Sequence, residues 1–373
     1  MTSAARRRSY LDWMRGLAVL VMIEAHVIDS WTRTPDRLGA GFGQSLILGG
    51  FGAPLFLLLA GVGLALSAQS KSRRLGGDAA AVRAVGRRGV EIFLLAFLFR
   101  VQAWLISRSE PRAMLKVDIL NIMGPSIVAT ALLWRAFTTF RGRLTALASA
   151  TVVLVFATPI VRATPLLNPL PDYLEAYIRP IPELTNFAAF PWAAFVPAGA
   201  CLGMLIDRAR TREQESRLNL WFGVGGASLA FAAFAASYLP SPYPRSDFWT
   251  SSPAFFFLRA GIMTTAIASA CLWESRASAG LRWSPMILLG RSSLFIYWIH
   301  VEMVYGIVST PLHHALSLPA AWLALGAFCV FMLGCAAMKE QVVANWRDRG
   351  GKTARRIREA EASHPADAFA KMR

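Results

Sequence analysis

The chain has 373 residues, of which 55% are hydrophobic, with a mean hydropathy of +0.44 and a formal net charge of +17. This is too apolar for a soluble domain of the same length. Apolar runs of about 18–22 residues recur along the chain, enough to cross roughly 30 Å of hydrocarbon as helix. The composition therefore predicts an all-α fold, a polytopic membrane helical bundle.

Run length and the polar breaks between runs predict about ten transmembrane helices. We expect residues 1–346 to form one transmembrane domain and residues 347–373 to be a charged, disordered cytoplasmic tail. The predicted spans cover approximately residues 13–31, 44–68, 90–107, 117–138, 144–161, 187–206, 218–238, 254–273, 286–308 and 320–338.

Lysine and arginine alternate between the loops in a way that predicts topology. By the positive-inside rule the cation-rich loops are cytoplasmic, which puts both termini in the cytoplasm and agrees with an even number of spans. The net charge then reflects topology and contact with anionic lipid rather than nucleic-acid binding. The cation-rich parts are the amino terminus with Arg6 and Arg7, the 69–89 loop, the 141–143 turn, the 208–217 run and the segment after Lys339.

The first predicted span carries ionisable residues that a lipid-facing helix would exclude. At about 100° per residue, Arg15, His26 and Asp29 share one stripe, and His26 lies about 16 Å deeper than Arg15. Glu24 lies on another face, and Arg100 in the third span is a candidate ion-pair partner for it. Ionisable groups at this depth need a cavity or a partner, so they are candidates for function.

Two further spans carry polar residues at helical spacing. In the ninth span Ser293, Tyr297 and His300 share a face, and His300 either orients a reacting group or braces a neighbouring helix. In the fourth span Asp118 and Asn121 share a face. No zinc-ligand spacing, phosphate-binding loop or dinucleotide fingerprint is present, so the sequence predicts no metal site.

Five blocks of the sequence together carry a family resemblance. They are "YLDWMRGLAVLVMIEAH", "GGFGAPLFLLLAGVGLALS", "KVDILNIMG", "FPWAAFVPAGACLG" and "LGRSSLFIYWIH". The chain resembles the heparan-α-glucosaminide N-acetyltransferase family from about residue 8 to 340, and "LDWMRGLAVLVM" is the most specific block. The resemblance implies a multi-span acyltransferase that passes acetyl from cytosolic acetyl-CoA to an acceptor on the far side of the membrane.

A related superfamily, the acyltransferase family three enzymes, has a basic residue, ten further residues and then a histidine, and Arg15 and His26 fit that spacing. In the lysosomal namesake the proposed active histidine lies further along, but this sequence has no histidine between positions 27 and 299. The resemblance therefore implies that His26 is catalytic and that Arg15 serves the acyl-CoA side.

From these observations we predict the roles of seven residues. His26 is a general base or a transient acyl carrier, Asp29 steers its imidazole or binds the acceptor, and His300 assists transfer. A basic vestibule would bind the phosphates of acetyl-CoA. The expected vestibule residues are Arg15, Arg87, Arg88 and Arg291.

The predicted function is acyl transfer from cytoplasmic acyl-CoA to an extracytoplasmic glycan or amino-sugar acceptor. We expect an integral protein of a bacterial cytoplasmic membrane and leave a homodimer open. One alternative is an O-acetyltransferase of a cell-envelope polysaccharide. The other is a proton-coupled transporter with a relay through Glu24, His26, Arg100, His300 and Glu302.

Overall fold

The computed structural model describes residues 8–107, 111–276 and 284–362, and statements about absence below concern these residues. They contain no β-strand, only the isolated bridges Thr32–Leu316 and Val117–Thr185. The fold is therefore all-helical, as predicted. The helices are α1 (Ser9–Trp31), α2 (Ala40–Gly49), α3 (Gly52–Leu75), α4 (Asp78–Ser107), α5 (Ile119–Ala136), α6 (Phe140–Ala163), α7 (Asp172–Ile178), α8 (Ala189–Trp192), α9 (Phe195–Arg208), α10 (Arg212–Ala236), α11 (Pro253–Arg276), α12 (Pro285–Arg291), α13 (Ser293–Tyr305) and α14 (Leu318–Ala362).

Each of the ten predicted spans coincides with one helix or with two consecutive helices. Within the described residues, eight helical stretches are long and apolar enough to cross a membrane, and the pair α12 and α13 makes a ninth. Helix α1 has 23 residues, enough for a crossing, but its charged side chains set it apart from the others. The chain is an integral, multi-pass membrane protein.

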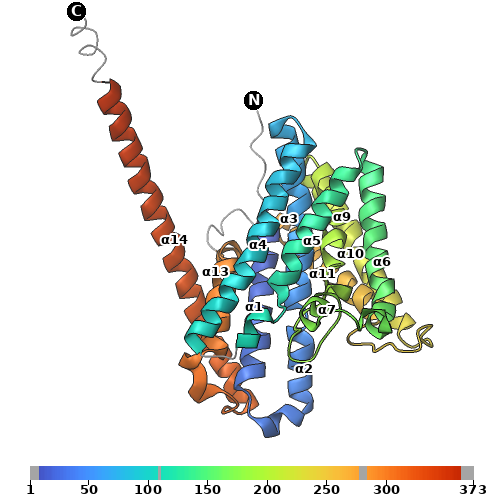
Figure 1. Cartoon of the computed structure of the whole chain (residues 1–373). Helices are drawn as coiled ribbons and strands as arrows, with labels where there is room; N and C mark the ends of the chain where they lie inside the picture. Colours follow the sequence, from blue (N-terminus) through green and yellow to red (C-terminus); the bar gives the residue numbers. More distant parts are fainter. Residues whose placement is uncertain (1–7, 108–110, 277–283, 363–373) are drawn as a thin grey trace, which may run out of the picture.

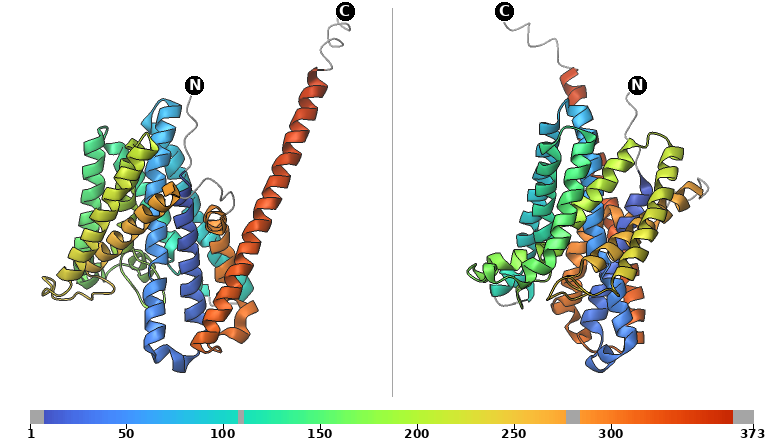
Figure 2. Two further views of the ribbon diagram at one scale, coloured as in Figure 1. Left: turned by 180° about the vertical axis from the view of Figure 1, so that it is seen from behind. Right: turned by 90° about the vertical axis from the view of Figure 1, so that its right-hand side faces the viewer.

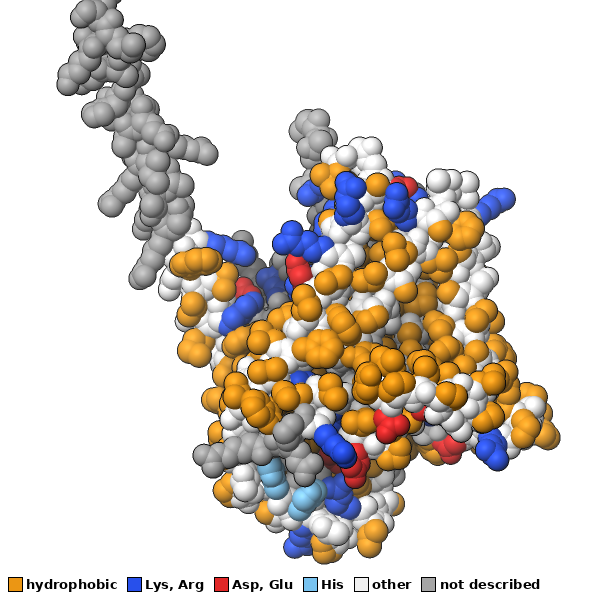
Figure 3. All heavy atoms as spheres, in the orientation of Figure 1, with side chains coloured by type: hydrophobic (Ala, Val, Ile, Leu, Met, Phe, Trp, Pro, Cys, Tyr) orange, Lys and Arg blue, Asp and Glu red, His pale blue; other side chains and the backbone are white. Residues whose placement is uncertain are grey.

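The loops lie at the two ends of the bundle, in the two groups that their charges predict (Figure 1). The start of α1 and the α3–α4, α5–α6 and α9–α10 connections lie at one end, which we call the basic end. The connections after α1, α6, α10 and α13 lie at the opposite end. Figure 3 shows hydrophobic side chains spread over the middle of one face, with lysine and arginine gathered toward both ends. That distribution suits a bilayer around the middle of the bundle.

Helix α14 leaves the bundle over much of its length. Its first part packs against α12 and α13, and its carboxyl-terminal part extends beyond the basic end (Figure 2). The helix continues to Ala362, whereas the predicted tail begins at residue 347. Residues 363–373 of that tail, and Arg6 and Arg7 of the predicted basic amino terminus, lie outside the described residues.

Helix α1 is the centre of the bundle, since it packs against α2, α3, α11, α12, α13 and α14. Its backbone meets that of α12 directly. A Cβ on Gly290 would lie 1.8 Å from the carbonyl oxygen of Asp12, and a Cβ on Gly16 would lie 2.0 Å from that of Met286. Because protein rather than lipid surrounds α1, its ionisable side chains can meet polar partners.

The ninth predicted span is broken rather than continuous. It forms α12 and α13, which are bent by 87° relative to each other at Ser292. The bend falls at residues 290–293 (GRSS), a short polar, glycine-containing interruption of the apolar run. The close backbone contact of Gly290 with α1 accompanies the bend, and α13 then carries Ser293, Tyr297 and His300 toward the interior.

Glycines also bring α3 and α9 together, a common role of small residues between membrane helices. A Cβ on Gly61 would lie 1.9 Å from the carbonyl oxygen of Val196, and a Cβ on Gly199 would lie 1.9 Å from that of Leu58. No side chain fits at either position unless the helices separate. Since α3 forms one wall of the central cavity described below, this contact also fixes the shape of the site.

We expect Gly61→Ala to destabilise the fold by about 1–3 kcal/mol, because the added methyl group must push α9 away from α3. Gly225→Ala is the matched control, since a Cβ there would meet nothing within 4 Å and alanine favours helix. Thermal unfolding in detergent measures both. An unchanged midpoint for Gly61→Ala would contradict the close contact.

Candidate active site

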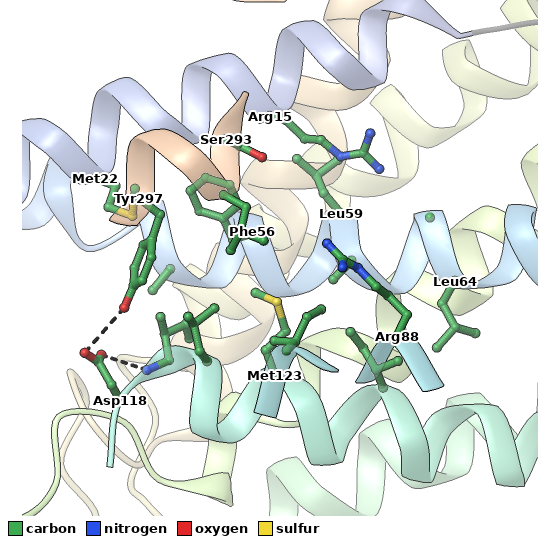
Figure 4. A pocket seen from close by; sticks show the side chains of 18 of the residues that line it. Arg15, Met22, Phe56, Leu59, Leu64, Arg88, Asp118, Met123, Ser293 and Tyr297 are labelled. Atoms are coloured by element: carbon green, nitrogen blue, oxygen red, sulfur yellow. Dashed lines mark hydrogen bonds between the residues drawn. The ribbon is translucent and has the colours of Figure 1, made fainter. Parts of the chain in front are cut away.

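A cavity of about 440 Å³ lies within the bundle between α1, α3, α4, α5 and α13. We call it the central cavity. Arg15, Lys71 and Arg88 line it toward the basic end, whereas His26, Asp118 and Tyr297 line it deeper in the bundle. Between them its walls are mainly apolar, with Phe56, Leu59, Leu64 and Met123 among the lining residues. Figure 4 shows Arg15 and Arg88 on the side of the cavity away from the Asp118–Tyr297 pair.

His26 and His300 form a hydrogen-bonded pair of imidazoles. His26 Nδ1 and His300 Nε2 are 2.9 Å apart, and the ring planes differ by 12°. His300 is fully buried, and its Nδ1 donates to the carbonyl oxygen of Ile296 at 2.7 Å. The sequence predicts both histidines but not that they touch, because they are 274 positions apart.

This chain of hydrogen bonds selects the tautomer of both neutral rings. The carbonyl oxygen of Ile296 can only accept, so His300 carries its proton on Nδ1 and its Nε2 accepts. His26 must therefore donate from Nδ1 to His300. The Nε2 atom of His26 is left with an available lone pair, which is the form a general base requires.

Asp29 lies beside this pair but does not hydrogen-bond to His26 directly. Its carboxylate accepts from Arg37 Nη2 at 2.9 Å and from the Tyr305 hydroxyl at 3.1 Å. Tyr305 in turn packs edge-on against the ring of His26, with centroids 5.5 Å apart. Asp29 thus orients Tyr305, which supports the imidazole. Neither Asp29 nor His300 is among the residues that line the central cavity.

The four predicted arginines of the vestibule separate in the structure. Arg15 and Arg88 line the central cavity, whereas Arg87 lines a different cavity between α4 and α5, and its side chain is 83% exposed. Arg291 lies 4.0 Å from Asp12 and is not among the lining residues. Lys71 also lines the central cavity. The sequence does not distinguish it from the other cations of the predicted 69–89 loop.

Asp118 joins three elements at the deep end of the cavity. Its side chain caps the amino terminus of α5, accepting from the backbone N–H of Ile119 at 2.7 Å, in a capping box with Asn121. It also accepts from Arg100 Nη2 at 2.8 Å and from the Tyr297 hydroxyl at 3.4 Å. The network places a carboxylate and a phenol on the cavity wall near His26. In the sequence, only the position of Asp118 within the fourth predicted span pointed to it.

The expected ion pair between Glu24 and Arg100 is wrong. Arg100 pairs with Asp118, because α4 packs against α5, and the Glu24 carboxylate has no hydrogen-bond partner among the described residues. Glu24 lies instead against the α2–α3 junction, where a Cβ on Gly49 would lie 2.9 Å from its Oε2. A proton-coupled transporter would need a relay through Glu24, His26, Arg100, His300 and Glu302. All five residues are described, and among them only His26 and His300 are linked to each other by a hydrogen bond or an ion pair.

The fold and the central cavity define a multi-pass membrane protein whose interior holds cations toward one end and a paired imidazole deeper in. Residues 7–235 match the family described as "Heparan-alpha-glucosaminide N-acetyltransferase, catalytic", and the chain belongs to this family. The match covers α1, α3, α4 and α5, four of the five helices around the central cavity, while α13 lies beyond it. No curated protein matches the chain. The protein is thus a membrane acetyltransferase.

Proposed function

We propose that the protein transfers an acetyl group from cytoplasmic acetyl-CoA to an amine or hydroxyl of an extracytoplasmic glycan or amino sugar. The observation that carries the proposal is the central cavity, which joins Arg15, Lys71 and Arg88 to His26 through mainly apolar walls. The positive-inside rule assigns the basic end to the cytoplasm, where acetyl-CoA is available. The family match supports acetyl as the group transferred.

The residues present suit the donor. Arg15, Lys71 and Arg88 would bind the phosphates, since guanidinium and ammonium groups form strong, charge-assisted hydrogen bonds with them. The apolar stretch lined by Phe56, Leu59 and Leu64 would hold the long, thin arm that carries the thioester. Arg15 and His26 are about 16 Å apart along α1, so phosphates and acyl group occupy different depths of one cavity.

His26 would act as general base through Nε2. It takes the proton of the acceptor amine or hydroxyl while a new C–N or C–O bond forms and the C–S bond of the donor breaks, so that the thiolate leaves on CoA. His300 is a positioning residue, because its hydrogen bond holds His26 in the required tautomer. The Asp118–Tyr297 pair would contact the acceptor at the deep end of the cavity.

We expect His26→Ala to lower kcat by about 10²–10⁴-fold, the usual contribution of a general base. His300→Ala should lower kcat less and leave KM for acetyl-CoA unchanged, because the base remains but its tautomer and orientation are no longer fixed. Acetyl transfer by purified protein in nanodiscs measures both. His313→Ala is the matched control, since His313 hydrogen-bonds to Ser309 and Val304 outside the central cavity.

Undiminished turnover of a folded His26→Ala protein would remove His26 from the mechanism. An acetyl group found on His26 after incubation with the donor alone would assign it as an acyl carrier rather than a base. Mass spectrometry of the product distinguishes an N-acetyl from an O-acetyl acceptor. A hydroxyl acceptor depends more on general-base help than a free amine, so it should show the larger loss in His26→Ala.

Adjacent arginines provide a test of the donor end. Arg87 and Arg88 both pair with Glu91, but only Arg88 lines the central cavity. We expect Arg88→Gln to raise KM for acetyl-CoA about tenfold, because it removes a charge-assisted contact with phosphate. Arg87→Gln should leave KM unchanged. Equal effects of the two substitutions would mean that the arginines act only through the general charge of the surface.

A further inference from the structure

A second cavity, of about 210 Å³, lies next to the deep end of the central cavity. It is formed by the end of α6, the segment before α8, α8 itself, the connection after α10 and the start of α11. Two loops far apart in sequence, at 164–188 and 237–252, thus converge on it at the opposite end of the bundle. Among its lining residues are Arg162, Asn186, Trp192, Trp249, Thr250 and Arg259.

Arg259 in this cavity carries a guanidinium that has no carboxylate partner among the described residues. The carbon at the centre of its guanidinium lies 3.9 Å from the ring centroid of Phe255 and 5.6 Å from that of Trp192. Its Nε is buried without a hydrogen-bond partner, and no ion pair within 4 Å joins it to a carboxylate of the described residues. Glu24 lies near the same α2–α3 junction, but no ion pair links the two. A partly desolvated cation without a counter-ion is costly to maintain unless a ligand supplies the charge.

Arg162 adds a second cation to the same cavity. Its Nε and Nη2 donate to the carbonyl oxygen of Phe190 at 3.3 and 3.1 Å, which fixes the side chain without neutralising it. Asp247 is close enough to act on Arg162 electrostatically, yet no ion pair within 4 Å joins them. The cavity therefore keeps an excess of positive charge.

The remaining lining residues suit a sugar ring. Trp192 and Trp249 offer aromatic faces, and Asn186, Thr250 and Ser252 offer neutral donors and acceptors. Tryptophan combines an apolar face with a polar N–H, which matches the mixed surface of a pyranose. Aromatic rings and uncompensated guanidinium groups together favour a sugar that carries an oxyanion over a neutral sugar.

A thin wall separates the two cavities. Phe187 lines the central cavity, Asn186 and Ala188 line the second, and the ring of Phe187 packs against that of Trp192 with centroids 4.9 Å apart. Arg259 also reaches this wall, since its Nη2 would lie 3.1 Å from a Cβ on Gly50, next to the cavity-lining Gly49. A ligand in the second cavity would thus lie beside the site of transfer.

We propose that the second cavity is a binding site for a carboxylate- or phosphate-bearing sugar unit of the acceptor, held by Arg259 and Arg162. This inference rests on the proposed function for its biological meaning, because the bound unit would neighbour the one that receives the acetyl group. The binding itself needs neither the donor nor His26. The family match covers Arg162, Asn186 and Trp192 of this cavity, whereas Arg259, Trp249 and Thr250 lie outside the matched residues 7–235.

The test measures binding of glucuronate, glucose 6-phosphate and glucose to the purified full chain in phosphatidylcholine nanodiscs. Quenching of the fluorescence of Trp192 and Trp249, checked by calorimetry, reports binding. We expect at least one of the two acidic sugars to bind at least tenfold more tightly than glucose. Arg259→Gln should weaken that binding at least tenfold and Arg162→Gln should weaken it as well. The exposed Arg245→Gln is the matched control and should have no effect.

Equal affinity for glucose and for both acidic sugars, or full affinity in Arg259→Gln protein of unchanged melting temperature, would overturn the proposal. Loss of acidic-sugar binding in nanodiscs that contain phosphatidylglycerol would also overturn it, because the site would then belong to a lipid headgroup. Binding retained by His26→Ala would support it even if acetyl transfer to glycans failed, so this proposal and the proposed function can fail separately.

Discussion

The hydrogen bond between His26 and His300 is the interaction on which the account of this protein depends. An imidazole in the middle of a membrane bundle needs a polar partner, and here the partner is a second, fully buried imidazole anchored to the Ile296 carbonyl oxygen. The pair satisfies both nitrogens of His300 and Nδ1 of His26, and it leaves the lone pair of Nε2 on His26, a residue that lines the central cavity. The remaining features position this atom. They are the backbone contact of α1 with α12, the bend before α13 and the Asp29–Tyr305 contact.

The membrane environment explains why the charges are arranged as they are. Helix α1 carries ionisable residues that would be costly in lipid, and it is surrounded by six other helices. Helices such as α4, α10 and α14 have few ionisable residues in their apolar stretches, and most of these stretches are exposed, as expected of helices that face lipid. The cations of the central cavity lie toward the basic end, where the proposed donor would bind. The cavity thus links two environments without exposing its imidazole to lipid.

The sequence predicted the elements of the fold well but not the pairing of side chains. Each predicted span falls on one helix or on two consecutive helices, because apolar run length follows directly from bilayer thickness. Of the polar stripe predicted for α1, Arg15 and His26 line the central cavity, whereas Asp29 does not. Helical spacing, however, says nothing about which helices become neighbours. The sequence therefore could not show that His300 meets His26, or that Arg100 pairs with Asp118 rather than Glu24.

Helical spacing also fails to distinguish cations that lie close together in the sequence. Arg87 and Arg88 are adjacent and have the same side chain. Because consecutive residues of a helix are rotated by about 100°, only Arg88 lines the central cavity. Lys71 was one of many cations in the predicted 69–89 loop, and Arg259 was the single arginine of the predicted span 254–273. Their importance follows from cavities that exist only after α3, α4, α6 and α11 have packed. The bend at Ser292 falls at the short polar segment GRSS, residues 290–293, but such a segment alone does not predict an angle of 87°.

The most direct measurement of the central claim is a structure of the protein in nanodiscs with a non-hydrolysable acetyl-CoA analogue. We expect phosphates beside Arg15, Lys71 and Arg88, and the acetyl carbonyl carbon beside Nε2 of His26, with the His26–His300 hydrogen bond intact. An analogue bound outside the central cavity, or one whose acetyl group lies away from His26, would contradict it.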